Sequence, residues 1–346
     1  MRVFLFLLFF PLVSTAFENV QFSGAVDLVQ PGTETPADNK LGVRGMELMF
    51  YGPLDPIFDA VLNVAGHPHE GGEFEFELHE ALIRSSKLVD RMNFKLGKFF
   101  LGVGRLNQTH QHDWPFIQAP LYHTKFFAAE GVADEGFETS RLWGQETPLD
   151  TTLGVTNGYV YGHAHDGGER PPHPLVYLRQ GISGETESGP AWSLGLNGLQ
   201  RTSAQQERTR LWGLDFVLKH REGALLKHLF QAELWNRERQ SPDVDALRDT
   251  GFYAFYQRGL NTSWAAGLRV DGYSDHNKRF VTTGELRRDF DYALVPQVTW
   301  RSSEFATFRA AYTRAVDTTQ GDDDKTEQRL DFQIVYLMGA HPAHEF

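Results

Sequence analysis

The chain has 346 residues, no cysteine, 33 Lys and Arg against 45 Asp and Glu, and a formal net charge of −12. This acidic balance argues against a nucleic-acid partner, because phosphate binding requires a basic surface. The lack of cysteine excludes disulfides, thiol catalysis and thiolate zinc sites. The mean hydropathy of −0.39 is too polar for a bundle of membrane helices, yet 13% of the residues are aromatic.

Residues 1–16 have the pattern of a secretory signal peptide. Arg2 precedes an apolar run from Val3 to Val13, and small residues follow up to Ala16. The run is too short for a membrane anchor, which needs about 20 residues. We therefore expect cleavage after Ala16, export of the protein, and one domain over residues 17–346.

Period-2 alternation is the dominant pattern after the signal peptide. In residues 73–79, for example, Phe74, Phe76 and Leu78 alternate with Glu or His. Such alternation predicts β-strands with one apolar and one polar face. Turn signals divide the chain into about sixteen such segments, with 14 or 18 as alternatives. The predicted segments begin near Val20, Gly42, Ile57, Glu73, Met92, Phe137, Asp150, Leu175, Ala191, Thr209, His228, Gly251, Ser263, Asp289, Phe305 and Gln328.

Two architectures produce this alternation: a soluble β-sandwich and a membrane β-barrel. Many of the segments run to about ten residues or more, whereas soluble strands average about five or six. The polar face also carries full charges, as a water-filled lumen allows, and aromatic residues recur at segment ends, as interface girdles do. These end residues are Tyr51, Phe100, Trp143, Trp192 and Trp300. We therefore predict an all-β, transmembrane antiparallel barrel surrounded by lipid in the outer membrane of a Gram-negative-type bacterium. A soluble exported β-protein, such as a carbohydrate binder, is the alternative.

The C-terminus is a separate signal. Phe346 ends the chain with the same parity as Phe332, Ile334 and Tyr336. Bacterial outer-membrane barrels resemble this, since their amphipathic last strand ends in a Phe that the barrel-assembly machinery reads. We expect that machinery to bind Phe346. Pro342 cannot donate to a strand ladder, so the last residues are expected to bend or to lie at an edge.

Between Gly104 and Gly136 the alternation stops. A loop of about 30 residues in a compact protein is usually functional. It could extend outside the barrel or fold into the lumen, where it would narrow the pore. Four large rings favour the inward placement, because exposed loops seldom carry so many without a packing partner. They are Trp114, Phe116, Phe126 and Phe127.

The same region carries a resemblance to known families. The segment from Gly97-Lys98-Phe99 to Gly136 resembles the pore-folding region of phosphate-selective porins of the O and P type. The Lys/Arg ladder of those pores is not evident in this chain. Further motifs are similar to a porin-sized family known as zinc-regulated outer-membrane receptors. They are Gly104-Arg105-Leu106-Asn107, His110-x-His112, Pro115-Phe116, Glu130-Gly131, Asp134-x-Gly136, and residues 152–158 and 339–344.

Histidines at His-x-His spacing are the candidate metal ligands. On a strand, residues i and i+2 share a face, so two imidazoles can chelate a transition metal. Three such pairs occur: His67 with His69, His110 with His112, and His163 with His165. A carboxylate, Asp113 or Asp166, follows each of the last two pairs. His110, His112, His163 and His165 are therefore the candidate zinc ligands, and no other cofactor is expected.

No nucleophile elbow, zinc-protease motif or suggestive Ser/His spacing occurs, so an enzyme is not predicted. The predicted function is a porin-like channel for passive diffusion of small hydrophilic solutes or ions. The alternative is a zinc-associated uptake or binding barrel that uses the His-x-His pairs. A homotrimer is the assembly suggested by analogy with sixteen-stranded porins. The residues expected at the constriction are Lys98, Arg105, Trp114, Phe116, Lys125, Glu130, Asp134, Glu135 and Arg141.

Overall fold

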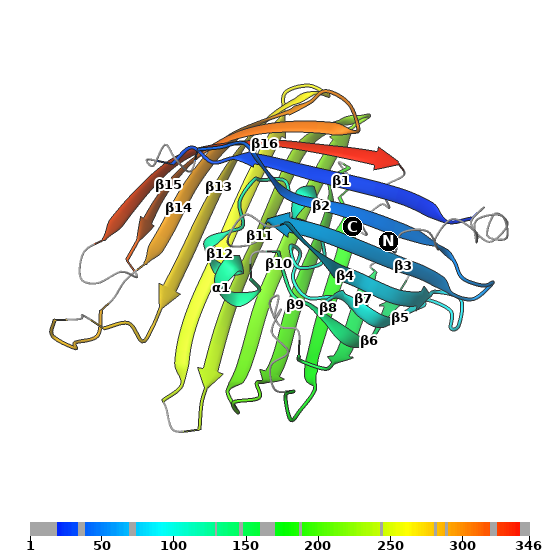
Figure 1. Ribbon diagram of the computed structural model, residues 1–346, viewed down its shortest axis with the longest axis horizontal. Coiled ribbons are helices and arrows are strands. Elements are labelled where there is room, and N and C mark those ends of the chain that lie inside the picture. The colour runs from blue at the N-terminus through cyan, green and yellow to red at the C-terminus, as the bar shows by residue number, and fades with distance from the viewer. Residues whose placement is uncertain are drawn as a thin grey trace, which may run out of the picture.

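The sixteen predicted segments form one closed sheet. A computed structural model describes residues 19–33, 39–68, 74–128, 130–144, 148–159, 170–186, 189–242, 245–279, 282–287, 290–318 and 324–339. In it, each strand pairs antiparallel with its neighbours in sequence, and β1 closes the barrel against β16 (Figure 1). The strands are β1 (Gln21–Gln30), β2 (Gly42–Pro53), β3 (Asp59–Pro68), β4 (Phe74–Ser85), β5 (Met92–Phe100), β6 (Ala133–Trp143), β7 (Leu149–Thr156), β8 (Leu175–Glu185), β9 (Ala191–Thr202), β10 (Arg208–Glu222), β11 (Leu225–Gln240), β12 (Leu247–Gly259), β13 (Trp264–Asp275), β14 (Asp291–Arg301), β15 (Ala306–Asp317) and β16 (Lys325–Gly339). Two short helices, η3 (Gln111–Asp113) and α1 (Leu121–Phe126), lie between β5 and β6.

The prediction of an all-β antiparallel barrel with sixteen strands is confirmed. Each predicted start lies within four residues of the observed one. The largest differences are at β6 and β12, where charged or small residues precede the first clear alternation. Alternation therefore located the strands. It defined their ends less well, because the period-2 pattern becomes weak near the turns.

The two faces of the sheet differ as the alternation predicts. On β14, Leu294 and Val298 are exposed on the outside, whereas Gln297 and Thr299 are buried on the inside. Exposed large apolar side chains recur on the outer face along the barrel. Exposing such a surface to water is unfavourable, whereas contact with lipid hydrocarbon is favourable. The closed hydrogen-bond ladder pairs the backbone groups of the described strands in that environment.

The connections alternate in length around the barrel. The β10–β11 and β12–β13 turns are short, while the β5–β6 and β13–β14 connections are long. Outer-membrane barrels place short turns on the periplasmic side and long loops outside. The β5–β6 connection therefore departs from the extracellular end of the barrel.

No helix in the described part of the chain is long and apolar enough to cross a membrane. Several predictions concern residues outside the described ranges: the signal peptide at 1–16, the histidines His69, His163 and His165, the bend at Pro342 and the terminal Phe346.

Candidate functional site

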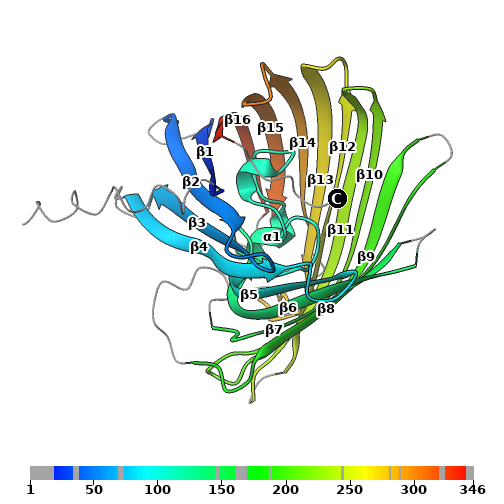
Figure 2. The same cartoon turned by 90° about the vertical axis from the view of Figure 1, so that its right-hand side faces the viewer.

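The β5–β6 connection turns into the barrel. Both views place its α1 segment within the ring of strands (Figure 1, Figure 2). We call residues 101–132 the lumen loop, because β5 ends at Phe100 and β6 begins at Ala133. The predicted inward fold is therefore confirmed. The predicted range of 104–136 extended too far, since residues 133–136 already pair in β6; their Asp, Glu and Gly residues lack the apolar alternation that marks a strand.

Aromatic rings hold the lumen loop against the wall. Trp114, Phe116, Phe126 and Phe127 are each at most 1% exposed. Their partners are rings on the inward face of β11 and β12: Phe127 lies 4.9 Å from Trp235, and Phe116 lies 5.4 Å from Phe255, between ring centroids. Burying one such ring stabilises the docked loop by about 1.5–3 kcal/mol. This docking surface was not predicted from the sequence, although Trp235 and Phe255 lie at inward-facing positions of adjacent strands and could have indicated it.

Wall side chains also bind the loop backbone near its start. The backbone N–H of Gly104 donates to Asn197 Oδ1 at 2.8 Å, and that of Leu106 donates to Glu233 Oε1 at 2.9 Å. Gly104 has a φ of +64°, a left-handed conformation that glycine adopts without steric cost. The sequence Gly104-Arg105-Leu106 is thus a sharp turn docked on β9 and β11.

The middle of the loop is held by its carbonyl groups. Three side chains from β14, β2 and β13 donate to three carbonyls over four residues of the loop. The pairs are Gln297 with Pro115 at 2.6 Å, Arg44 with Ile117 at 2.5 Å, and Arg269 with Gln118. The loop therefore contacts β9 and β11 at its start and the β13–β2 side at its middle, so that it crosses the lumen.

The barrel interior holds four of the predicted constriction residues: Trp114, Phe116, Lys125 and Asp134. Trp114 and Phe116 are packed between the loop and the wall. Lys125 is exposed, and its Nζ lies 4.3 Å from the centroid of the Tyr273 ring. Asp134 is buried and accepts a hydrogen bond of 2.5 Å from the backbone N–H of Gly158.

Three predicted residues lie on the other face, which corrects the prediction for them. Lys98 and Glu135 stand opposite each other on β5 and β6, at the parity of the exposed Leu96 and Phe137. Arg141 continues that face, and the centre of its guanidinium group lies 4.1 Å from the centroid of the Trp143 ring. Lys98, Glu135 and Arg141 thus face outward. The lumen-facing pair at this position is Lys95 and Glu138, 2.8 Å apart, which parity alone would have identified.

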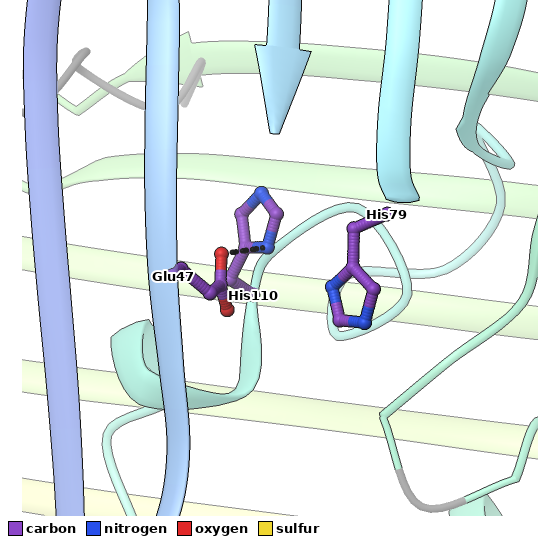
Figure 3. Close-up of side chains that lie close together, drawn as sticks. All are labelled: Glu47, His79 and His110. Carbon is purple, nitrogen blue, oxygen red and sulfur yellow. Dashed lines mark ion pairs between the residues drawn. The ribbon is translucent and has the colours of Figure 1, made fainter. Parts of the chain in front are cut away.

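A cluster of histidines and glutamates joins the start of the lumen loop to the wall. Glu47 of β2 contacts two imidazoles, with Oε2 2.9 Å from His110 Nδ1 and Oε1 3.1 Å from His112 Nδ1. His110 Nε2 lies 3.2 Å from Glu80 of β4. Figure 3 shows the Glu47–His110 ion pair, with His79 beside it. His110 and His112, predicted as a chelating pair, therefore meet at one carboxylate.

The carboxylates keep these loop imidazoles protonated. Burial opposes the charged form of both rings, but Glu47 and Glu80 outweigh it and raise the pKa of His110 well above its ordinary value. Against the same burial penalty, Asp113 and Glu47 raise the pKa of His112 to about 10. The two imidazolium groups thus pair with partly buried carboxylates and fasten the loop to β2 and β4.

Two groups of side chains in the described ranges have donor atoms close enough to hold one metal ion. One consists of Glu47, His79 and His110, and the other of His67, His79 and Glu130. His79 is common to both groups. Glu130, predicted as a constriction residue, therefore lies among histidines inside the barrel.

Comparison with known proteins places the architecture. No protein-family model matches the chain. An uncharacterized protein of Aquifex aeolicus (strain VF5) is 24% identical over 333 residues, which is 87% of this chain and 69% of that protein. The anion-selective porin of Comamonas acidovorans superposes with a TM-score of 0.61 at 10% identity, covering 92% of this chain and 99% of the porin. Salmonella typhi OmpF, in complex with daunomycin, has a TM-score of 0.59 at 8% identity, with 92% and 98% covered. The fold is that of the outer-membrane porins.

This porin fold, with its apolar outer face, is that of an outer-membrane β-barrel of a Gram-negative-type bacterium. At identities of 8–10% the likeness shows the fold alone, so the selectivity of those porins is not transferred to this chain. The resemblance to phosphate-selective porins and to zinc-regulated receptors stays a prediction.

Proposed function

We propose that this chain is a porin-like channel through which small hydrophilic solutes or ions diffuse passively. The observation that carries the proposal is a closed barrel with a polar inner face and a loop anchored across its lumen. A polar lumen provides a path for hydrated solutes, and an anchored loop limits their size and places charges beside them.

Charged groups inside the barrel would set its ion preference. Many acidic residues of the inner wall are neutralised by neighbouring arginines, for example Asp215 by Arg179. By contrast, Lys219 of β10 lies within the electrostatic reach of Arg105 and Arg221, and Arg301 of β14 within that of Arg221. We propose this basic group, with Lys125 of the loop, as the source of the field that a permeating ion meets.

Conductance in planar bilayers tests the channel. The full chain, folded in detergent and shown to be folded by heat-modifiable gel migration, should insert and produce reproducible current steps. The same preparation, unfolded by boiling, is the control and should produce none. Repeated absence of steps with folded protein would contradict the proposal and favour a closed binding barrel.

Zinc-associated uptake is the second candidate, favoured by the histidines and glutamates gathered in the lumen. Proteoliposomes loaded with a fluorescent chelator separate the two candidates. A passive channel should admit Zn²⁺ and Mg²⁺ at similar rates, whereas a marked preference for Zn²⁺ at low concentration would support selective uptake.

A further inference from the structure

An irregularity in β4 turns two adjacent side chains into the lumen. Asn63 of β3 pairs with Glu80, but the next residue, Val64, pairs with Leu78. His79 is therefore the extra residue of a β-bulge, which re-aims side chains. Under strict alternation Glu80 would share the outer face with Leu78. Because of the bulge, Glu80 contacts the loop at His110 and His79 is 3% exposed.

His67 of β3 meets His79 inside the barrel. Their Nε2 atoms lie 3.1 Å apart, and the rings stack at 5.1 Å between centroids with an interplanar angle of 22°. Two imidazole nitrogens bound to one tetrahedral Zn²⁺ at about 2.0–2.1 Å would be separated by roughly 3.3 Å. The two side chains thus already present nitrogen atoms at the spacing that a shared metal requires.

Two carboxylates approach the same two imidazole rings. Glu77 Oε1 lies 3.3 Å from His79 Nε2 and 3.8 Å from His67 Nε2. Glu130 Oε2 lies 3.5 Å from His79 Nε2, and its Oε1 lies 3.0 Å from His67 Nδ1. The Glu130 side chain is 16% exposed, so these donors are largely shielded from water while remaining reachable from the lumen.

We propose that His67, His79, Glu77 and Glu130 form a binding site for one divalent transition-metal ion. Two imidazoles and two carboxylates suit Zn²⁺, which takes four nitrogen and oxygen ligands, better than Mg²⁺ or Ca²⁺, which prefer oxygen alone. The neighbouring group also contains His79, but there His110 is already paired with Glu47, so we leave Glu47 and His110 out of the proposed site.

The location of the site gives metal binding a consequence for the channel. His67, His79 and Glu77 belong to the wall strands β3 and β4, whereas Glu130 is near the end of the lumen loop. A metal held by all four would join the loop to the wall. This consequence rests on the proposed channel, whereas the site itself does not.

Calorimetry with the folded full-length chain tests the site. After removal of bound metal with a chelator, titration with Zn²⁺ should show one tight site per chain. His79→Asn should weaken this binding by about 100-fold or more, since loss of even an outer-shell partner costs roughly 10–100-fold. Glu130→Gln should weaken it by at least about tenfold. Co²⁺ bound in place of Zn²⁺ should show an intense visible spectrum that His79→Asn abolishes.

A second cross-strand histidine pair provides the matched control. His220 and His228 also stack, at 5.7 Å between ring centroids, but on the outer face of β10 and β11. The double variant His220→Asn with His228→Asn should leave the tight site unchanged. Heat-modifiable migration confirms that each variant is folded, and Glu130→Gln lies outside the strands, so it tests the site even if His79→Asn fails to fold.

Two outcomes would overturn the inference. One is that the parent binds Zn²⁺ no more tightly than the folded His79→Asn and Glu130→Gln variants, and the other is that the outer-face control loses the tight site. Failure of the channel proposal is seen separately, because calorimetry requires no conductance. If the protein binds Zn²⁺ tightly but shows no conductance, the metal site is supported and the channel proposal is contradicted.

Discussion

The side-chain amide of Gln297 on β14 donates a hydrogen bond of 2.6 Å to the backbone carbonyl of Pro115, 182 positions earlier in the chain. Arg44 and Arg269 bind the carbonyls of Ile117 and Gln118 in the same way. Because these wall side chains bind main-chain carbonyls, they hold the loop in place independently of the side chains that the loop residues carry. The width of the lumen is therefore controlled by residues of the wall as well as of the loop.

Gln297→Ala should loosen this anchor. The Pro115 carbonyl would lose its partner, at a cost of about 1–3 kcal/mol if it stays buried. We expect a larger mean conductance and more current noise in planar bilayers, because the loop spends more time away from the lumen centre. Gln200→Ala, at an exposed position on the outer face of β9, is the control. Equal changes in both variants would contradict the anchoring role.

Neutralising the basic group should change ion selectivity. Lys219→Gln and Arg301→Gln each remove a positive charge from the inner face, so the reversal potential in a salt gradient should shift toward cation preference. The shift should shrink at high salt because of screening. Arg141→Gln removes the same charge from the outer face and should produce no shift. A shift of the same size in Arg141→Gln would show that the overall charge of the protein, and not the charges inside the lumen, controls selectivity.

Lowering the pH should weaken docking of the lumen loop through His123. This ring is fully buried against Trp114, and burial lowers its pKa to about 3, against a smaller opposing effect of its bond to the Ala128 carbonyl. Below about pH 6.5 the undocked ring binds a proton that the docked ring excludes, so docking loses about 1.4 kcal/mol per pH unit down to about pH 3. Above pH 6.5 this contribution is constant.

Hydrogen exchange of the lumen loop, corrected for intrinsic rates, measures this dependence. His123→Asn keeps a donor for the Ala128 carbonyl but does not titrate, so the difference in slope between parent and variant isolates His123. Identical slopes between pH 6.5 and 4 would exclude His123 as the cause.

An arginine on the outer face should be costly only where lipid covers it. Leu196, in the middle of β9, is 58% exposed, and Leu54, beside β2 in a turn, is 63% exposed. Leu196→Arg should destabilise the barrel by about 2–4 kcal/mol in urea unfolding from lipid vesicles, whereas Leu54→Arg should cost little. Similar small costs for both would favour the alternative of a soluble exported β-protein.

Several features of this protein follow from its sequence alone. A period-2 pattern reports the face of each residue locally, so alternation located the strands and put Phe332 outside and Asp331 inside. The rings of the lumen loop also required an apolar surface, which predicted that the loop folds inward. These conclusions hold because side-chain direction in a strand depends on the chain itself and not on its partner.

The tertiary structure decided what depends on pairing between strands. The wrong placement of Lys98 is a different case, because its parity with the exposed Leu96 already places it outside and Lys95 inside. The bulge at His79 is a property of the register between β3 and β4, and no local pattern marks it. His67 was noted for its His-x-His spacing with His69, which lies outside the described residues, whereas its contact with His79 of the neighbouring strand has no counterpart in the spacing of the sequence. Register and loop docking bring together residues far apart in sequence, and for that reason only the folded barrel shows them.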